Sequence, residues 1–389
     1  MRIYKKFSGW KQNAGCLALA WCLTVVGISS AQTTAPTTSP APLPPVSSPE
    51  IHGDGRITFR LRASGASKVS VDMGGMTEPA PMSMDGKGVW SVTLGPFAPQ
   101  IYEYGFRVDG VRMLDPANPI YQPAPSMTTS LVEIPAAKPL YYDYQNVPHG
   151  TVRVETYDSK SLGRMRNLRV YTPAGYDRDS AARYPVLYLL HGSGDNEATW
   201  SSGVGRAGWI ADNLIAAGNA KPMLIVMTDG HAVIPIQSGR DPKATLANLL
   251  AYQADLLGDV IPFVEANYRV LPDREHRAII GLSMGGRQSL TIGLEHLDLF
   301  AWVGGMSAVA PTPETTFADV LKDPAATNER LKLLYYCCGK ADPLMVGARQ
   351  FDGLLSERGI RHQFVEITGG HEWRTWRPAL RDFLELIFR

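Results

Sequence analysis

The sequence has few cysteines, almost no net charge and few long apolar runs. Only four of its 389 residues are cysteine, and 38 Lys and Arg residues stand against 37 Asp and Glu residues. A net charge this small excludes the strong electrostatic field that draws a protein to nucleic acid or to an anionic membrane surface. Without a framework of disulfides, a chain of this length depends on a sizeable hydrophobic core.

The cysteines fall into two pairs. Cys16 and Cys22 lie near the N-terminus, and Cys337 and Cys338 are neighbours in an apolar run. Adjacent cysteines cannot close a disulfide without a strained ring, and they lack the spacing of a metal site. We therefore expect no metal here, and we expect Cys337 and Cys338 to pack as small hydrophobic residues.

Residues 1–31 are predicted to be a signal peptide. Four positive charges among residues 2–11 precede an apolar stretch at 14–28, and small residues follow at 29–31. This order is typical of a cleaved secretory signal, and the apolar stretch is short for a membrane span, which is the alternative. We expect a secreted or periplasmic protein with no stable membrane insertion once the signal is removed.

Two differently patterned regions follow the signal. Residues 32–50 are rich in Pro, Ser and Thr, which is typical of an extended linker. Over residues 51–136, short alternating segments are separated by turn signals such as DGKG at 85–88, and no helical period appears. This pattern predicts a small immunoglobulin-like β-sandwich. Its predicted strands cover residues 56–63, 68–73, 89–95 and 101–110.

From residue 141 to residue 389, apolar strands alternate with helical stretches. This alternation predicts an α/β fold, with a mostly parallel central sheet and helices on both of its faces. After an initial pair of strands near 151–172, the predicted strands cover residues 184–192, 223–230, 278–283, 301–307, 332–339 and 361–367.

One serine lies where a strand should turn into a helix. The motif GLSMG at 281–285 follows an apolar strand and precedes a helical stretch, which is the setting of a nucleophile elbow. Such a bend exposes the Ser283 hydroxyl above the sheet. The alternative is an ordinary strand-to-helix turn whose serine caps the helix.

A serine nucleophile needs a base and an acid that follow it in the order Ser, acid, His. Of the histidines after Ser283, His371 in TGGHEW follows the last strand, where a loop can bring it over the sheet edge. The other two, His296 and His362, fall in a helix and at a strand start. We therefore assign His371 as the predicted base.

The predicted acid is Asp342, which lies just beyond the strand at 332–339. It would accept the imidazole N–H and stabilise the imidazolium. Its alternative role is that of a helix N-cap, and both roles can hold for different oxygens. Neither Asp323 nor Asp352 follows a strand, so both are weaker candidates.

Two backbone amides are needed to stabilise the oxyanion of a tetrahedral intermediate. The residue after the nucleophile, Met284, supplies one. The other should come from the glycine-rich loop LLHGSGD at 189–195, where Ser193 is favoured and Gly192 comes next.

At this point the sequence resembles a known family. The segments LYLLHGSGDNEATW, GLSMGG, CCGKADPL and GGHEWRTWRPALRDF are similar to those of the putative esterase family, also called carbohydrate esterase family one, which includes feruloyl and acetylxylan esterases. The resemblance implies an α/β-hydrolase fold without metal or organic cofactor. It also implies a Ser283, Asp342, His371 triad, with the Ser193 and Met284 amides as the oxyanion hole.

The β region has a resemblance of its own. The segment at 102–119 is similar to the immunoglobulin-like module that precedes glycogen-branching enzymes, the family 48 carbohydrate-binding type. Exposed Trp90, Tyr102 or Tyr104 could stack on sugar, although strand alternation places some of them in the core. The short polar stretch at 141–150 favours a domain that docks beside the hydrolase and shapes the pocket mouth.

The sequence thus predicts a secreted serine esterase that hydrolyses feruloyl or related esters on plant cell-wall polysaccharide through an acyl-enzyme. The alternatives are an acetylxylan or general carboxylesterase, a siderophore esterase of the enterochelin type, and a non-catalytic binding protein. The candidate substrate contacts, whose tryptophans core packing would explain equally well, are Trp200, His231, Trp373 and Trp376.

Overall fold

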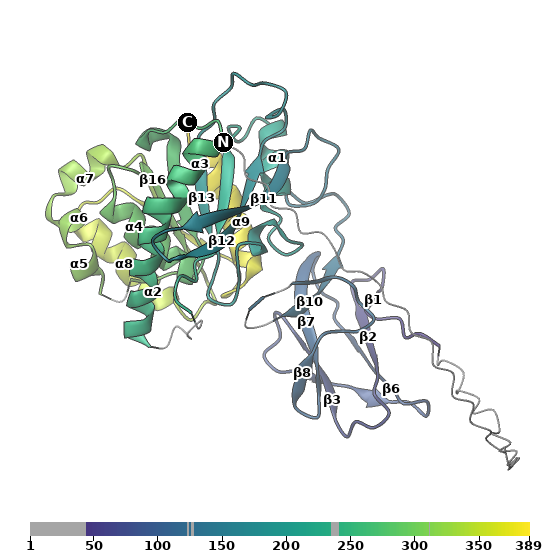
Figure 1. The fold of residues 1–389 in the computed structure, drawn as a ribbon. Coiled ribbons are helices and arrows are strands. Elements are labelled where there is room, and N and C mark those ends of the chain that lie inside the picture. Colours follow the sequence, from purple (N-terminus) through teal and green to yellow (C-terminus); the bar gives the residue numbers. More distant parts are fainter. Residues whose placement is uncertain (1–43, 123, 126–127, 235–240, 311) are drawn as a thin grey trace, which may run out of the picture. The chain divides into compact units, whose positions relative to one another are not determined.

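The computed structural model describes residues 44–122, 124–125, 128–234, 241–310 and 312–389. The predicted signal peptide and most of the predicted linker lie outside these residues. Residues 45–389 form one compact unit (Figure 1). Within the described residues, no helix is both long enough and apolar enough to cross a membrane.

The N-terminal part is a β-sandwich, as its alternating pattern predicts. One sheet has the strand order β1-β2-β6-β5, and the other has the order β4-β3-β7-β10-β9, with β8 paired to β7. The strands are β1 Glu50–Ile51, β2 Ile57–Arg62, β3 Val69–Met73, β4 Ala80–Pro81, β5 Ser83–Met84, β6 Val89–Leu94, β7 Gln100–Val108, β8 Val111–Met113, β9 Tyr121–Gln122 and β10 Thr129–Ile134.

The aromatic residues that were candidates for sugar stacking form the core of this sandwich. Trp90, Tyr102 and Tyr104 are all buried, and they pack with residues such as Phe59 and Phe106 between the two sheets. Inward-facing positions alternate along each strand, so these rings have no open face for a ligand. The suggestion that they bind sugar is therefore corrected.

The C-terminal part is built on one eight-stranded sheet. Its order is β11-β12-β14-β13-β15-β16-β17-β18, with β11 and β12 antiparallel and the strands from β14 onward parallel. This is the α/β-hydrolase arrangement expected from the alternation of strands and helices. The strands are β11 Thr151–Ser159, β12 Arg164–Thr172, β13 Val186–Leu190, β14 Leu224–Thr228, β15 Arg277–Gly281, β16 Trp302–Met306, β17 Leu333–Gly339 and β18 Gln363–Ile367.

Helices cover both faces of this sheet (Figure 1). Helices α1 and α9 share one hydrophobic cluster with the sheet, and α2, α3, α4, α6 and α8 share the other. The helices are α1 Ala207–Ala216, α2 Pro242–Asp255, α3 Ile261–Asn267, α4 Met284–Glu295, α5 Pro313–Thr316, α6 Ala318–Lys322, α7 Pro324–Arg330, α8 Met345–Glu357 and α9 Trp373–Leu386. A π-helical turn at Leu256–Val260 joins α2 to α3.

Both faces of the sheet are buried, which explains why the strand sequences are apolar throughout. In β13, Leu187 and Leu189 belong to the cluster under α1 and α9, whereas Tyr188 and Leu190 belong to the cluster on the opposite face. Successive side chains alternate between two buried faces, so every position must be apolar. Both Cys337 and Cys338 are buried free thiols in the same way, as expected.

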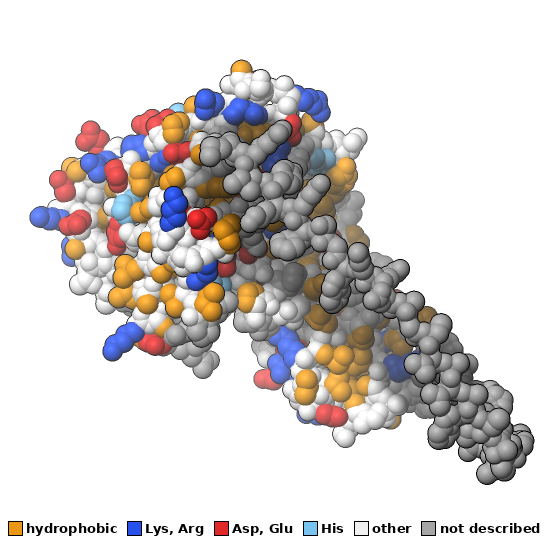
Figure 2. Space-filling view, in the orientation of Figure 1, with side chains coloured by type: hydrophobic (Ala, Val, Ile, Leu, Met, Phe, Trp, Pro, Cys, Tyr) orange, Lys and Arg blue, Asp and Glu red, His pale blue; other side chains and the backbone are white. Residues whose placement is uncertain are grey.

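The sandwich contacts the hydrolase part through apolar and polar residues. Ile101 and Leu131 of the sandwich belong to the same hydrophobic cluster as Trp200. The Gln122 amide donates to the Thr199 hydroxyl at 3.1 Å. These contacts fit the predicted docked arrangement. On the face drawn in Figure 2, acidic and basic side chains are interspersed, as the balanced composition implies.

Candidate active site

Ser283 occupies a sharp bend between β15 and α4. Its backbone has φ 52° and ψ −113°, a conformation that residues other than glycine rarely adopt. The flanking glycines are required by space, because a Cβ on Gly281 would lie 2.5 Å from Gly285, and a Cβ on Gly285 would lie 2.4 Å from the His191 carbonyl oxygen. Strand and helix can therefore cross this closely only with glycine on either side of the serine.

The bend brings Ser283 to His371 and Asp342. His371 Nε2 lies 2.9 Å from Ser283 Oγ, and His371 Nδ1 lies 2.9 Å from Asp342 Oδ2. The three residues come from the ends of β15, β17 and β18, whose carboxyl ends share one edge of the parallel sheet. The arrangement allows a proton to pass from the hydroxyl to an imidazole that a carboxylate orients.

Asp342 is held by two separate partners. Its Oδ2 faces the His371 ring, and its Oδ1 accepts a hydrogen bond from the Leu344 amide at 2.8 Å. Burial opposes its ionisation, but the hydrogen bonds from His371 and Leu344 outweigh burial and lower the pKa of Asp342 below its usual range. The carboxylate therefore stays ionised beside an imidazole whose side chain is partly exposed.

The competing histidines and aspartates lie elsewhere. His362 Nε2 pairs with Asp352 Oδ1 at 2.9 Å, away from Ser283. His296 lies at the C-terminal end of α4 beside Gln253, and the Asp323 side chain caps the N-terminus of α7. The structure thus brings together only the preferred members of the predicted set.

The loop after β13 lies against the start of α4. The Gly285 amide donates to the His191 carbonyl at 3.1 Å, and both Ser193 and Met284 line the same cavity as Ser283. Met284 is the first residue of α4, and the first amides of a helix have no carbonyl partner within it. Both predicted oxyanion donors therefore lie beside the serine.

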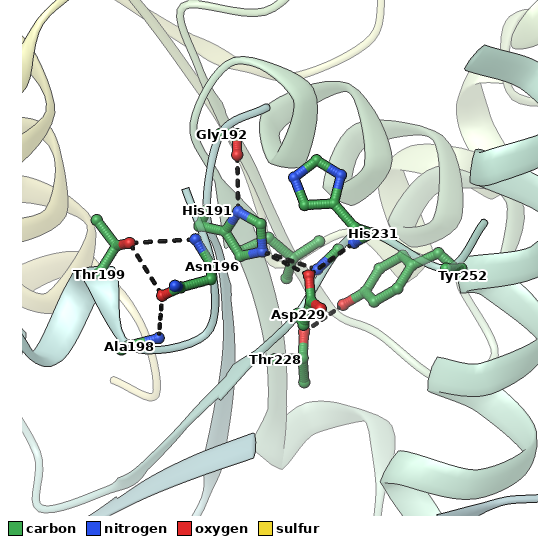
Figure 3. A network of polar contacts seen from close by, with 12 residues as sticks. His191, Gly192, Asn196, Ala198, Thr199, Thr228, Asp229, His231 and Tyr252 are labelled. Carbon is green, nitrogen blue, oxygen red and sulfur yellow. Dashed lines mark hydrogen bonds and ion pairs between the residues drawn. The ribbon is translucent and has the colours of Figure 1, made fainter. Parts of the chain in front are cut away.

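A buried polar network fixes this loop (Figure 3). His191 Nδ1 lies 2.7 Å from the Gly192 carbonyl oxygen, and the Gly230 amide donates to its Nε2 at 2.8 Å. Burial opposes ionisation of Asp229 beside this ring, but His191, the Arg166 guanidinium and the His231 amide lower the pKa of Asp229 to about 2. The Asp229 charge thus helps to hold the two loops that follow β13 and β14 together.

A cavity of about 230 Å³ opens beside Ser283. It lies just below the common size range of ligand pockets, roughly 300–1,000 Å³, so it suits an acyl group better than a polysaccharide chain. Its wall is formed by the start of α4, by α2 and by loop residues. The lining residues beside Ser283, Ser193 and Met284 are His231, Val233, Ala244, Thr245, Asn248, Leu249, Arg287, Gln288, Ala308, Val309 and Leu344.

The predicted substrate contacts divide into two groups. His231 lines the cavity. Trp200, Trp373 and Trp376 are buried in the core, where Trp373 packs edge-on against both of the other indoles. Buried rings present no face on which a substrate could stack, so the substrate-contact role of the tryptophans is corrected to core packing.

Sequence reasoning missed Arg287 and Gln288 in the cavity wall. Arg287 stands four residues after Ser283, one turn along α4, so its helical position alone carries the signal. Nothing in the sequence shows that α2 closes the other side of the cavity. No group of three or more His, Cys, Asp or Glu side chains within the described residues is arranged to hold a metal ion.

A family model described as "Putative esterase" matches residues 159–387 of the chain. The match covers more than half of the sequence and includes every residue of the Ser283 site. The chain belongs to this esterase family. The match begins at residue 159, so the β-sandwich, whose strands lie within residues 50–134, is outside the family match.

Curated relatives of this esterase include an endo-1,4-beta-xylanase/feruloyl esterase of Xylanibacter ruminicola. The two are 33% identical over 349 residues, which are 88% of this chain and 46% of the relative. Esterase Rv1288 of Mycobacterium tuberculosis is 28% identical over 266 residues, or 56% of this chain and 55% of the relative. The chain thus spans about half the length of the curated relatives it matches.

Solved structures similar to the esterase share its fold. A ferulic acid esterase of Anaeromyces mucronatus, solved in complex with ferulic acid, has a TM-score of 0.57 and 26% identity, covering 64% of this chain and 94% of that one. The enterobactin esterase of Shigella flexneri has a TM-score of 0.63 at 18% identity, covering 85% and 92%. The similarity to the enterobactin esterase extends over more of this chain, but at 18% identity it shows a shared fold alone.

Proposed function

We propose that the chain is a serine esterase that cleaves feruloyl or related acyl esters from plant cell-wall polysaccharide. The observation that carries the proposal is the pair of 2.9 Å contacts that join Ser283 Oγ to His371 and His371 to Asp342. A nucleophile, a base and an orienting carboxylate in this order form the constellation for acyl transfer.

The reaction proceeds in two acyl transfers. The Ser283 oxygen attacks the ester carbonyl carbon while its proton passes to His371 Nε2, and the Met284 and Ser193 amides stabilise the oxyanion. The imidazolium then protonates the departing sugar oxygen, which leaves the acyl group on Ser283. Water, deprotonated by His371, attacks this second ester and releases the free acid. Asp342 stabilises the imidazolium in both halves.

Two observations support an aromatic acyl group on a cell-wall sugar. The relative from Xylanibacter ruminicola is an endo-1,4-beta-xylanase/feruloyl esterase, and the structural neighbour from Anaeromyces mucronatus is a ferulic acid esterase. In this chain, the cavity beside Ser283 is bounded by apolar residues such as Val233, Leu249 and Val309, which suit an aromatic ring.

The siderophore esterase is a second candidate, and a basic residue in the cavity favours it. Arg287 lines the cavity, and the catechol of such a substrate carries ring oxygens that a cation can contact. In a catecholate trilactone of this type the catechol is joined through an amide to the group that bears the ester, so the scissile ester differs from a feruloyl ester in its acyl group and in the alcohol that leaves.

A substrate panel tests the proposal. Purified enzyme is assayed against methyl ferulate, methyl acetate and the methyl ester of N-(2,3-dihydroxybenzoyl)serine, a dihydroxybenzoyl ester with the same leaving alcohol, and kcat/KM is compared. We expect the feruloyl ester to give the highest kcat/KM. Higher kcat/KM on acetate would make the chain an acetyl or general esterase, and higher kcat/KM on the dihydroxybenzoyl ester would make it a siderophore esterase.

We also propose export by the signal at residues 1–31 and an accessory role for the sandwich. The sandwich reaches the loop after β13, because Gln122 contacts Thr199 and Ser202, and Arg206 pairs with Glu133. A domain fixed there can shape the approach of a polymeric substrate, whereas catalysis stays with the hydrolase part.

A further inference from the structure

Helix α4 presents two polar side chains to the cavity immediately after the nucleophile. Arg287 and Gln288 follow Ser283 by four and five residues, and the Arg287 amide donates to the Ser283 carbonyl at 3.0 Å. One helical turn advances about 5.4 Å along the axis. The Arg287 side chain therefore lines the cavity one turn away from the nucleophile, where it can contact a part of an acyl group other than its carbonyl.

The Arg287 guanidinium has no hydrogen-bond or ion-pair partner among the described residues. Two buried arginines are by contrast paired with carboxylates: Arg166 contacts Asp255 and Asp229, and Arg277 contacts Glu265. Burial lowers the pKa of Arg287, and no carboxylate offsets the effect. The cation still carries its charge at neutral pH, and its donors are left for a ligand.

Two buried neighbours in the same wall also have unsatisfied atoms. Gln288 is 2% exposed, and its Nε2 donates to the Gly230 carbonyl, so the remaining Oε1 is an acceptor without a partner. His231 is 6% exposed, and its Nε2 has no partner within the described residues. Buried polar atoms are rarely left unpaired, so these two side chains, together with the partly buried Arg287 in the same wall, point to a ligand with polar atoms.

We propose that Arg287 determines acyl specificity by donating hydrogen bonds to a ring oxygen at the distal end of an aromatic acyl group. Gln288 and His231 complete this polar end of the cavity. The inference rests on the proposed esterase function, and it names the acyl class that the same site prefers.

The hydrogen-bonding capacity of the unpaired atoms favours a phenolic hydroxyl as the ligand group. A guanidinium only donates hydrogen bonds, and an amide oxygen only accepts them. A phenolic hydroxyl does both, so it can accept from Arg287 and donate to Gln288 Oε1. A carboxylate would leave the Gln288 acceptor unsatisfied, and an acetyl group would reach neither residue. A methoxy oxygen beside the hydroxyl adds a further acceptor for Arg287.

Two esters that differ only in ring oxygens measure this preference. Methyl ferulate carries the hydroxyl and methoxy groups, and methyl cinnamate lacks both. The ratio of their kcat/KM values is compared in wild type, Arg287→Met and Arg287→Lys. A control, Arg349→Met, removes an exposed arginine on α8 that pairs with Glu366. Circular dichroism and thermal unfolding establish that each variant is folded.

We expect wild type and Arg349→Met to favour methyl ferulate by about tenfold or more, the size of one charge-assisted hydrogen bond. Arg287→Met should reduce the ratio by about tenfold, and Arg287→Lys should restore part of it, because lysine keeps a donor. An unchanged ratio in Arg287→Met overturns the inference, as does a wild type without preference.

The outcomes separate this inference from the proposed function. If wild type hydrolyses neither ester, the proposed function itself is wrong. If wild type hydrolyses both esters equally well, the esterase function stands and the role of Arg287 is rejected. Should Arg287→Met fail to fold, Arg287→Lys and the wild-type ratio still decide, because the ratio must exceed one and fall when the guanidinium fork is lost.

Discussion

At the scale of single residues, the proposed nucleophile Ser283 is held in a backbone conformation of high local energy. Its positive φ is a region that costs a residue with a Cβ of order 1–3 kcal/mol. The strain is tolerated because the Ser283 amide donates to the Met306 carbonyl and the Gly285 amide to the His191 carbonyl. These bonds hold the bend whichever residue stands at its apex.

Two substitutions at this position separate strain from chemistry. We predict that Ser283→Gly unfolds with a free energy about 1 kcal/mol above that of Ser283→Ala, because only glycine relieves the positive φ. Both variants lack the hydroxyl and should be equally inactive. Urea denaturation of the two proteins measures the difference, and a glycine variant clearly less stable than the alanine variant would contradict the strained bend.

The pH dependence follows from the Asp342 carboxylate. Because its folded pKa is depressed, it is ionised above the unfolded value of about 3.9 and loses its contribution only as the pH falls through the lower folded value. We predict that Asp342 takes up no proton on mild acidification, so that kcat/KM falls by no more than about tenfold per pH unit in that range. A steeper fall of kcat/KM in the mildly acidic range would show that Asp342 titrates there.

Removing that carboxylate tests its orienting role. We predict that Asp342→Asn lowers kcat by roughly 10³- to 10⁴-fold, because an amide at this position favours the wrong imidazole tautomer. Asp352→Asn is the matched control, since it removes the partner of His362 and should leave kcat within about twofold. A small loss in Asp342→Asn would contradict the assignment of the acid.

Whether a site residue could be predicted depended on its sequence motif and on its position after a recognisable strand. Ser283, Asp342 and His371 could be predicted because each follows a recognisable strand, and parallel strands bring their ends together. The roles of the three candidate tryptophans could not be assigned, because a short sequence near the site does not show which indole packs into the core and which one faces the cavity. Arg287 lies in a helix that was predicted, but the cavity it faces is formed by α2, which is distant in sequence.

At the scale of elements, the strands of the hydrolase sheet lie within a few residues of their predicted bounds. Their apolar composition gives a clear signal because both faces of the sheet are buried. The helical pattern over residues 246–268 is divided into α2 and α3 by the π-helical turn at Leu256–Val260. Short strands such as β8 and β9 have too few residues for a visible period.

Next to that π-helical turn, a buried ion pair ties α2 to the sheet. Asp255, the last residue of α2, contacts Arg166 of β12 at 2.5 Å and accepts a hydrogen bond from the Tyr157 hydroxyl at 2.7 Å. Arg166 also donates to the carbonyls of Asp229 and His231. The pair thus supports both the helix that closes the cavity and the loop that carries His231.

Breaking this pair should be costly for folding. We predict that Asp255→Asn lowers the free energy of unfolding by about 3–5 kcal/mol, because it leaves the Arg166 charge buried with a weakened partner. Asp177→Asn, which breaks an exposed pair with Arg153, should cost at most about 1 kcal/mol. Urea denaturation measures the free energy of unfolding of both variants. Equal losses of unfolding free energy would show that the buried pair stabilises the fold no more than the exposed pair does.

At the scale of the whole molecule, the sandwich and the hydrolase part share hydrophobic core. Ile101 and Leu131 of the sandwich lie in the cluster that holds Trp200 and Val204. The sandwich could be predicted from its alternating strands and turn signals. Its contacts with the loop after β13 could not, because they join residues about 80 positions apart whose patterns carry no pairing signal.

Because the two parts share one hydrophobic cluster, we expect the stability of the hydrolase part to depend on the sandwich. We predict that a chain beginning at Tyr141 has a thermal midpoint several degrees below that of a chain beginning at Pro45, because the cluster around Trp200 becomes exposed. Differential scanning calorimetry measures the two midpoints. Identical midpoints would mean that the contacts between the two parts contribute nothing to stability.

The central claim is that Ser283 forms the acyl-enzyme, and its most direct test is kcat/KM of Ser283→Ala on methyl ferulate against that of wild type. Mass spectrometry of the enzyme quenched during turnover, both intact and after proteolysis, accompanies the assay. We predict a loss of at least about a thousandfold in the variant, and a feruloyl adduct on the Ser283 peptide in wild type only. Activity in Ser283→Ala within tenfold of wild type would contradict the account, since Ser283 could then not be the required nucleophile.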